Sequence, residues 1–266
     1  MWSLAFAWAA GVRLPLWAPV LLALVAWSVY IGDRLLDARR GLRSPERRQL
    51  RERHFFHWRH RYALLPLAVA AALAAAGIVL AFMPLKARAP NSLLAAAALA
   101  YFSGVHSGRK LPRLVTKEFL VGMIFTAGCA LPAWLGLRAH GAGAAMWPWA
   151  LVVPAIYFAL LAWLNCHGIG QWELESGRES GAWRPRVAGV QSLGAALALA
   201  GLILACFALD AHPRAAALMI AGAASALLLA LLDRTRSRLT PLALRALADL
   251  VLLTPLILLP LQHILR

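Results

Sequence analysis

Long apolar runs follow one another along the whole chain, separated by short segments rich in arginine, glycine and proline. A helix that crosses the bilayer's hydrocarbon core needs about 20 mainly apolar residues. None of the runs shows the short alternation of polar and apolar residues that is typical of membrane β-strands. The pattern therefore predicts an all-α, polytopic membrane helix bundle, organised as a single transmembrane domain over residues 1–266.

The runs predict about nine spans, bounded where charged residues, glycine or proline interrupt the apolar sequence. The first run is short, and it forms either a partial span or an interfacial helix. The fourth is also short for a crossing. The predicted spans are 2–11, 15–32, 62–83, 91–105, 117–137, 147–166, 187–209, 214–232 and 242–262.

Composition strengthens the membrane assignment. Hydrophobic residues make up 62% of the chain and charged residues 14%, whereas a soluble domain is nearer half apolar and a quarter charged. All three cysteines, Cys129, Cys166 and Cys206, fall in apolar runs, so each is expected to be a small buried hydrophobe.

The formal net charge is +16, which in a soluble protein would suggest nucleic acid as the partner. The sequence has no soluble basic domain, so we expect no nucleic-acid binding. Anionic headgroups of the lipid bilayer or an anionic substrate fit the arginine-rich connections better.

The distribution of Lys and Arg predicts which loops are cytoplasmic. Connections 33–61, 106–116, 167–186 and 233–241 hold most of them, whereas the opposite connections hold Lys86, Arg88 and Arg138. Cytoplasmic loops of membrane proteins carry the excess of Lys and Arg. We therefore expect an integral membrane protein whose Lys- and Arg-rich connections lie on the cytoplasmic face. Polar loops gathered on one face favour an enzyme over a transporter, which would place polar groups at mid-membrane within internal repeats.

Two of the chain's eleven acidic residues, Asp33 and Asp37, lie one helical turn apart where the second apolar run ends. Acids at a membrane edge are costly and point to function. Carboxylates at i and i+4 can hold a divalent metal against a substrate phosphate. The alternative is that the pair only caps the span electrostatically, although acids at a helix C-terminus oppose the helix dipole.

The stretch Asp33-Arg34-Leu35-Leu36-Asp37 resembles half of the first aspartate-rich motif, N-D-x-x-D-R-x-x-D, of the UbiA superfamily of intramembrane prenyltransferases. Val29 and Tyr30 stand where that motif has Asn and Asp. The resemblance implies nine transmembrane helices and two aspartate-rich motifs that face each other at the cytoplasmic side of a central cavity.

Two further segments carry the resemblance. The stretch from Lys110 to Gly122 is similar to the family's basic loop, whose Lys and Arg residues meet the diphosphate. The second motif would fall on the segment from Asn165 to Glu175, where Asn165 and Glu173 are the oxygen donors and the usual aspartate cluster is missing.

The resemblance implies Mg²⁺-dependent transfer of an isoprenoid from its diphosphate to a small aromatic or lipid-like acceptor. Mg²⁺ would be held by Asp33 and Asp37, with Glu173 as a further ligand. Apolar helices would hold the isoprenoid tail and exclude water. Cations would stabilise the negative charge that grows on the diphosphate as the C–O bond breaks. The expected catalytic residues are Asp33, Asp37, Arg34, Lys110 and Asn165. The expected substrate-binding residues are Tyr30, His106, Arg109, Arg113, Lys117 and Glu173. The alternative is a catalytically degenerate member of the family that binds a lipid or acts as an assembly partner.

The segment 51–61 alternates Arg and His with aromatic residues, and His54 and His57 share one helix face. Three interpretations stay open: metal ligation, phosphate recognition, or a basic amphipathic helix on anionic headgroups.

Two polar residues inside spans also leave alternatives open. Asp249 lies four residues after Arg245, so the two either neutralise each other or line a cavity. Asn165 is either a site residue or the donor of an interhelical hydrogen bond.

Overall fold

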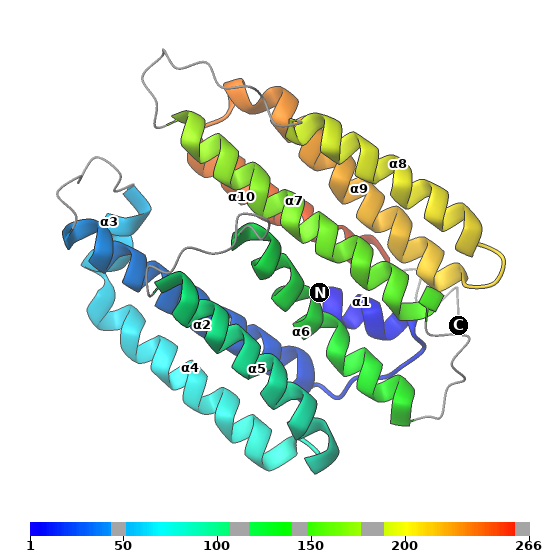
Figure 1. Cartoon of the computed structure of the whole chain (residues 1–266), viewed down its shortest axis with the longest axis horizontal. Coiled ribbons are helices and arrows are strands. Elements are labelled where there is room, and N and C mark those ends of the chain that lie inside the picture. Colours follow the sequence, from blue (N-terminus) through cyan, green and yellow to red (C-terminus); the bar gives the residue numbers. More distant parts are fainter. Residues whose placement is uncertain (44–51, 107–116, 140–147, 177–188, 259–266) are drawn as a thin grey trace. The chain divides into compact units, whose positions relative to one another are not determined.

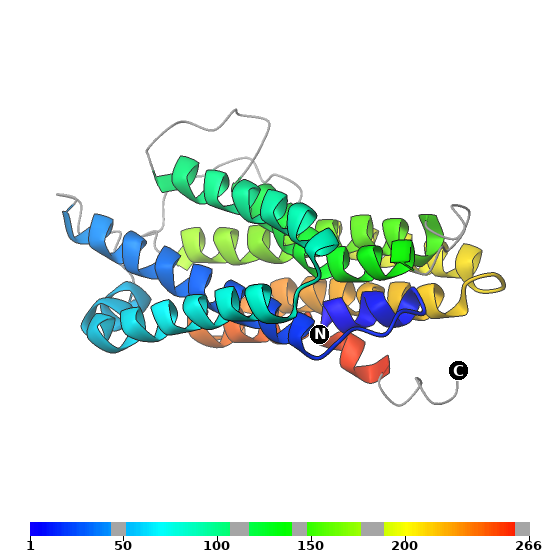
Figure 2. The same ribbon diagram turned by 90° about the horizontal axis from the view of Figure 1, so that it is seen from below.

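The computed structural model describes residues 1–43, 52–106, 117–139, 148–176 and 189–258, and every regular element in these ranges is helical (Figures 1 and 2). The prediction of an all-α, polytopic membrane bundle is thus confirmed in its class. The chain divides into two compact units, residues 15–111 and residues 1–14 with 112–266. Each unit is described by itself, and the prediction of a single domain stays a prediction.

The unit of residues 15–111 contains four helices, α2 (Trp17–Arg43), α3 (Glu52–Arg59), α4 (Arg61–Phe82) and α5 (Leu85–His106). Helix α2 packs along α4, and the two lie side by side in Figure 1. The buried residues of α4 are all alanines, Ala68, Ala71 and Ala75, spaced three and four apart. Such a small-residue face lets two membrane helices approach closely. The Ser28 hydroxyl, which donates to the Leu24 carbonyl of its own helix at 2.7 Å, also lies 3.2 Å from the carbonyl oxygen of Ala68.

The larger unit is built around α7. It comprises α1 (Trp2–Ala9), α6 (Lys117–Ala139), the π-helical turn η3 (Pro148–Val152), α7 (Val153–Ser176), α8 (Val190–Ala208), α9 (Pro213–Thr235), the 3-10 turn η4 (Arg236–Arg238), α10 (Pro241–Val251) and η5 (Thr254–Leu258). Helix α7 packs against α6, α8, α9 and α10. Helices α8 and α9 form a tight antiparallel pair, as Figure 1 shows.

The first predicted span, 2–11, is a short buried helix. Eight residues rise about 12 Å, too little to cross the bilayer core. Helix α1 instead packs on α6 and α9, where Phe6 has no exposed surface and Trp2 stacks on Phe158 of α7 at 4.0 Å between ring centroids.

Seven helical segments among the described residues are long and apolar enough to cross a membrane: 17–39, 61–82, 117–139, 150–173, 190–208, 213–238 and 241–258. Each coincides with one of the nine predicted spans. The two remaining predictions, 2–11 and 91–105, fall on α1 and inside α5, which are not among the seven. The count of nine spans and the UbiA-like arrangement are therefore not confirmed.

Helix α2 does not end where its apolar run ends. The predicted span stops at residue 32, but the helix continues to Arg43, so Asp33 and Asp37 lie within it. The helix dipole acts mainly on the last turn, and Asp37 lies before that turn. The expected conflict between the acid pair and the helix terminus is therefore absent at these two residues.

Candidate functional site

The acid pair on α2 faces a shared cation. Arg34 Nη2 lies 3.5 Å from Asp33 Oδ2, and Arg34 Nη1 lies 3.8 Å from Asp37 Oδ2. All three side chains are partly buried. The three charged residues of the D-R-x-x-D segment thus form one cluster of two carboxylates and one guanidinium, which we call the α2 acid cluster.

An aromatic residue extends the α2 acid cluster by one helical turn. The guanidinium carbon of Arg34 lies 5.3 Å from the centroid of the Tyr30 ring, a distance typical of a cation–π contact. The Tyr30 ring in turn meets His57 of α3 edge to face, with centroids 6.1 Å apart. His57 is buried, so α3 fixes one side of the cluster, and His57 belongs to this site rather than to an exposed surface.

The donor set of the α2 acid cluster fits one magnesium ion that shares its coordination with a substrate. Magnesium is usually held by one or two carboxylates, with substrate phosphates and waters completing the octahedron. Asp33 and Asp37 supply two carboxylates on one helix face. Among the residues that the structure describes, no group of three or more His, Cys, Asp or Glu side chains could hold a metal by itself.

Asn165 lies in the interior of the larger unit. Its side chain on α7 is 4% exposed, and its Oδ1 has no hydrogen-bond partner among the described residues. Thr126 Oγ1, on the neighbouring helix α6, is likewise buried without one in the same ranges. A buried acceptor without a donor is costly, so Asn165 is a candidate for contact with a ligand or a water.

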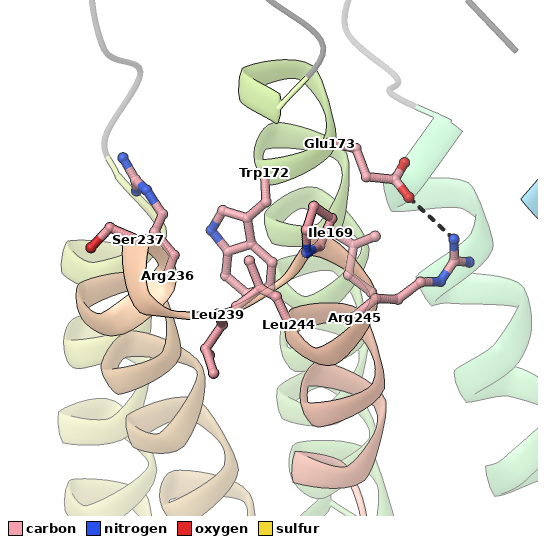
Figure 3. A pocket seen from close by; sticks show the side chains of 9 residues that line it. Ile169, Trp172, Glu173, Arg236, Ser237, Leu239, Leu244 and Arg245 are labelled. Atoms are coloured by element: carbon pink, nitrogen blue, oxygen red, sulfur yellow. Dashed lines mark hydrogen bonds and ion pairs between the residues drawn. The ribbon is translucent and has the colours of Figure 1, made fainter. Parts of the chain in front are cut away.

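Glu173 lies about two turns further along α7, near its C-terminal end, and lines a cavity of about 310 Å³. Its Oε1 accepts a hydrogen bond from Arg245 Nη1 of α10 at 3.2 Å. The cavity lies where α7, η4 and α10 meet (Figure 3), and we call it the α7–α10 pocket; its lining is Ile169, Trp172, Glu173, Arg236, Ser237, Leu239, Pro241, Leu244 and Arg245. The sequence suggested Asp249, four residues on, as the partner of Arg245. The structure shows in addition a long-range ion pair between Arg245 and Glu173.

A buried carboxylate that the sequence reasoning missed lies behind this pocket. Asp233 is 7% exposed. Its Oδ1 accepts from Trp172 Nε1 at 2.7 Å and from Arg236 Nη1 at 2.6 Å, and its Oδ2 accepts from the backbone N–H of Gln191 at 3.1 Å. The signal in the sequence was the pair Asp233-Arg234 at the end of an apolar run, the same dipeptide that marks the α2 acid cluster.

The predicted site residues divide between the two units. Tyr30, Asp33, Arg34 and Asp37 come together on α2, whereas Lys117 begins α6 and Asn165 and Glu173 lie on α7. His106 is the last residue of α5, and its side chain is outside the description. Arg109, Lys110 and Arg113, and His54 as a side chain, are likewise outside it. The meeting of the two groups at one cavity stays a prediction.

Comparison with known proteins gives no relative. No protein-family model, no curated protein and no solved structure matches this chain. The function must therefore be argued from the residues and their geometry.

Proposed function

We propose that this protein is an intramembrane prenyltransferase resembling the UbiA superfamily, which moves an isoprenoid from its diphosphate to a small aromatic or lipid-like acceptor. The observation that carries the proposal is the α2 acid cluster, in which Asp33, Arg34 and Asp37 meet within the last turns of the membrane span 17–39. Carboxylates and a guanidinium at the edge of a hydrocarbon layer suit a ligand with a charged head and an apolar tail.

Asp33 and Asp37 would hold one Mg²⁺ through their carboxylate oxygens, with Glu173 as the further ligand that the family resemblance implies. The bound ion supplies Lewis-acid stabilisation of the diphosphate. Arg34, which lies between the two carboxylates, donates to the diphosphate oxygens from the same face. Asn165 offers its free carbonyl oxygen as an acceptor within the apolar interior.

The remaining cations would act when the C–O bond of the isoprenoid breaks and negative charge grows on the departing diphosphate. We assign this role to Arg109, Lys110, Arg113 and Lys117, with His106 and Tyr30 lining the diphosphate end. Fixed cations aimed at growing charge in a dry site lower the barrier more than they would in water. The apolar helices hold the isoprenoid tail and keep water from the allylic cation.

We place this chemistry on the cytoplasmic face, because the connections that contain these cations hold most of the Lys and Arg of the chain. The partners of the protein are then the lipid bilayer, an isoprenoid diphosphate and its acceptor.

A second function is favoured by a separate observation. Glu173, the only acid expected from the second motif within the described residues, is already paired with Arg245, and Arg34 already neutralises part of the acid pair. A member of the same superfamily that binds a lipid or assists assembly without catalysis would show the same pairings.

The decisive experiment incubates the purified protein with radiolabelled prenyl diphosphates and Mg²⁺ and measures the release of diphosphate. Wild type should release it, and both Asp33→Ala and Asp37→Ala should fall to background. Asp210→Ala, a change of an exposed acid at the end of α8, is the matched control and should retain wild-type release. Equal background release by all four proteins would favour the non-catalytic function.

A further inference from the structure

The α7–α10 pocket has a chemical character of its own. Its floor is apolar, with Ile169, Leu239 and Leu244 around the indole of Trp172. Figure 3 shows Arg236 and Ser237 on one side of Trp172 and the Glu173–Arg245 ion pair on the other. An apolar floor with polar groups at its rim fits a ligand that is itself amphipathic.

The polar rim is held in place before any ligand arrives. Asp233 binds both the indole N–H of Trp172 and the guanidinium of Arg236. A guanidinium presents five N–H donors in a planar fork, so the single Arg236 side chain can contact more than one acceptor. Arg245, tied by Nη1 to Glu173, is prepared in the same way. Binding therefore requires little additional ordering of the rim.

The pocket lies at the ends of three candidate spans, and this position favours a membrane lipid as the ligand. The candidate spans 150–173 and 213–238 end at this pocket, and the span 241–258 begins there. The pocket thus lies at the common end of three candidate spans, the level at which lipid headgroups would reach it. Its volume of about 310 Å³ is at the small end of ligand pockets and suits one headgroup rather than a whole lipid.

The charges around the pocket favour an anion. Arg236 and Arg245 line it, and the exposed Arg234 and Arg238 flank Arg236 on the same segment. Asp233 pairs with Arg236 and Glu173 pairs with Arg245, while Arg234 and Arg238 add positive charge beside the pocket. Arginine near the membrane surface attracts anionic lipid.

We propose that the α7–α10 pocket binds the headgroup of an anionic phospholipid. Arg236 and Ser237 donate hydrogen bonds to the phosphate, and Trp172 with the surrounding aliphatic side chains accommodates the glycerol and the first methylenes. Glu173 is the one lining residue that the proposed prenyl transfer also uses, and this inference rests instead on Arg236, Ser237 and Trp172, none of which that proposal involves.

The test is a titration of the detergent-purified protein, followed by native mass spectrometry, with dioctanoyl phosphatidylglycerol and dioctanoyl phosphatidylcholine. The anionic lipid should bind about tenfold more tightly than the zwitterionic one. Arg236→Gln should weaken phosphatidylglycerol binding about tenfold, as expected for the loss of one charge-assisted hydrogen bond. Ser237→Trp, which fills the pocket and keeps every charge, should abolish this binding.

Arg238→Gln is the matched control, because it removes the same charge from the same 3-10 turn at an exposed residue that does not line the pocket. It should leave binding within about twofold of wild type. Equal binding of the two lipids, an equal loss in Arg238→Gln, or unchanged binding in Ser237→Trp would each overturn the proposal. Displacement by inorganic phosphate at the concentration of the lipid would show a site for free phosphate and would also overturn it.

Discussion

The indole N–H of Trp172 donates a 2.7 Å hydrogen bond to the carboxylate of Asp233, joining α7 to α9 in the interior of the larger unit. The same carboxylate accepts from the backbone of Gln191 at the start of α8 and from Arg236. One buried acid thus connects three helices and the turn that follows α9.

We predict that Asp233→Ala destabilises the protein by about 2–3 kcal/mol, because it leaves the buried indole N–H of Trp172 and the backbone N–H of Gln191 without their acceptor. Thermal unfolding in detergent, followed by tryptophan fluorescence, measures the change. Asp210→Ala removes an exposed acid and should change stability by less than about 0.5 kcal/mol. Equal melting temperatures for the two variants would show that the Asp233 contacts contribute nothing.

The close approach of α8 and α9 depends on Gly194. A Cβ at this residue would lie 2.8 Å from the carbonyl oxygen of Ala226 and 3.1 Å from the Cβ of Ala230. Gly194→Ala should therefore cost about 1–3 kcal/mol of stability, as overpacking does. Gly170→Ala on α7, where a Cβ would meet nothing within 4 Å, should be neutral or stabilising. A Gly194→Ala variant as stable as Gly170→Ala would contradict this packing.

The sidedness of the chain can be tested at the two ends of α9. Asp210 precedes this helix and Arg238 follows it, and both are exposed. In a variant with the three native cysteines replaced by alanine, Arg238→Cys should react with a membrane-impermeant maleimide only from the cytoplasmic side. Asp210→Cys should react only from the opposite side. The reverse pattern would invert the proposed topology, and labelling of both from one side would show that α9 does not span.

The helical class and seven spans followed from the sequence because apolar run length alone decides them. The span 62–83 agrees with α4 to within one residue at each end. Helix α1 has the same composition as a span and differs only in length. Helix α1 is buried because it packs on α6 and α9. These packing partners cannot be predicted from the residues of α1 alone.

Local spacing also explains which parts of the candidate sites were predictable. The charged residues of the α2 acid cluster lie within about one turn of one helix, so their contacts can be predicted from their spacing in the sequence. The partner of Glu173 is Arg245, 72 residues away, and Asp233 reaches Trp172 across 61 residues. Such pairings depend on which helices pack together. The predicted span 214–232 ends one residue before Asp233, so the apolar pattern places Asp233 in the connection 233–241 rather than in a packed helix.

Removal of divalent metal separates the roles of the two sites. Treatment with EDTA should abolish diphosphate release, because the α2 acid cluster needs Mg²⁺ to hold the diphosphate. Phosphatidylglycerol binding at the α7–α10 pocket should be unchanged, since arginine residues carry it. Metal-independent diphosphate release would contradict the assignment of Asp33 and Asp37 as metal ligands.

The most direct test of the central claim, that Asp33 and Asp37 hold a metal against an isoprenoid diphosphate, is electron–nuclear double resonance with Mn²⁺ in place of Mg²⁺. With farnesyl thiodiphosphate as an unreactive substrate analogue, wild type should bind Mn²⁺ and show ³¹P hyperfine coupling. The coupling should vanish in the Asp33→Ala and Asp37→Ala variants and persist in Asp210→Ala. An absence of ³¹P coupling in wild type, or coupling that survives in both cluster variants, would contradict the account.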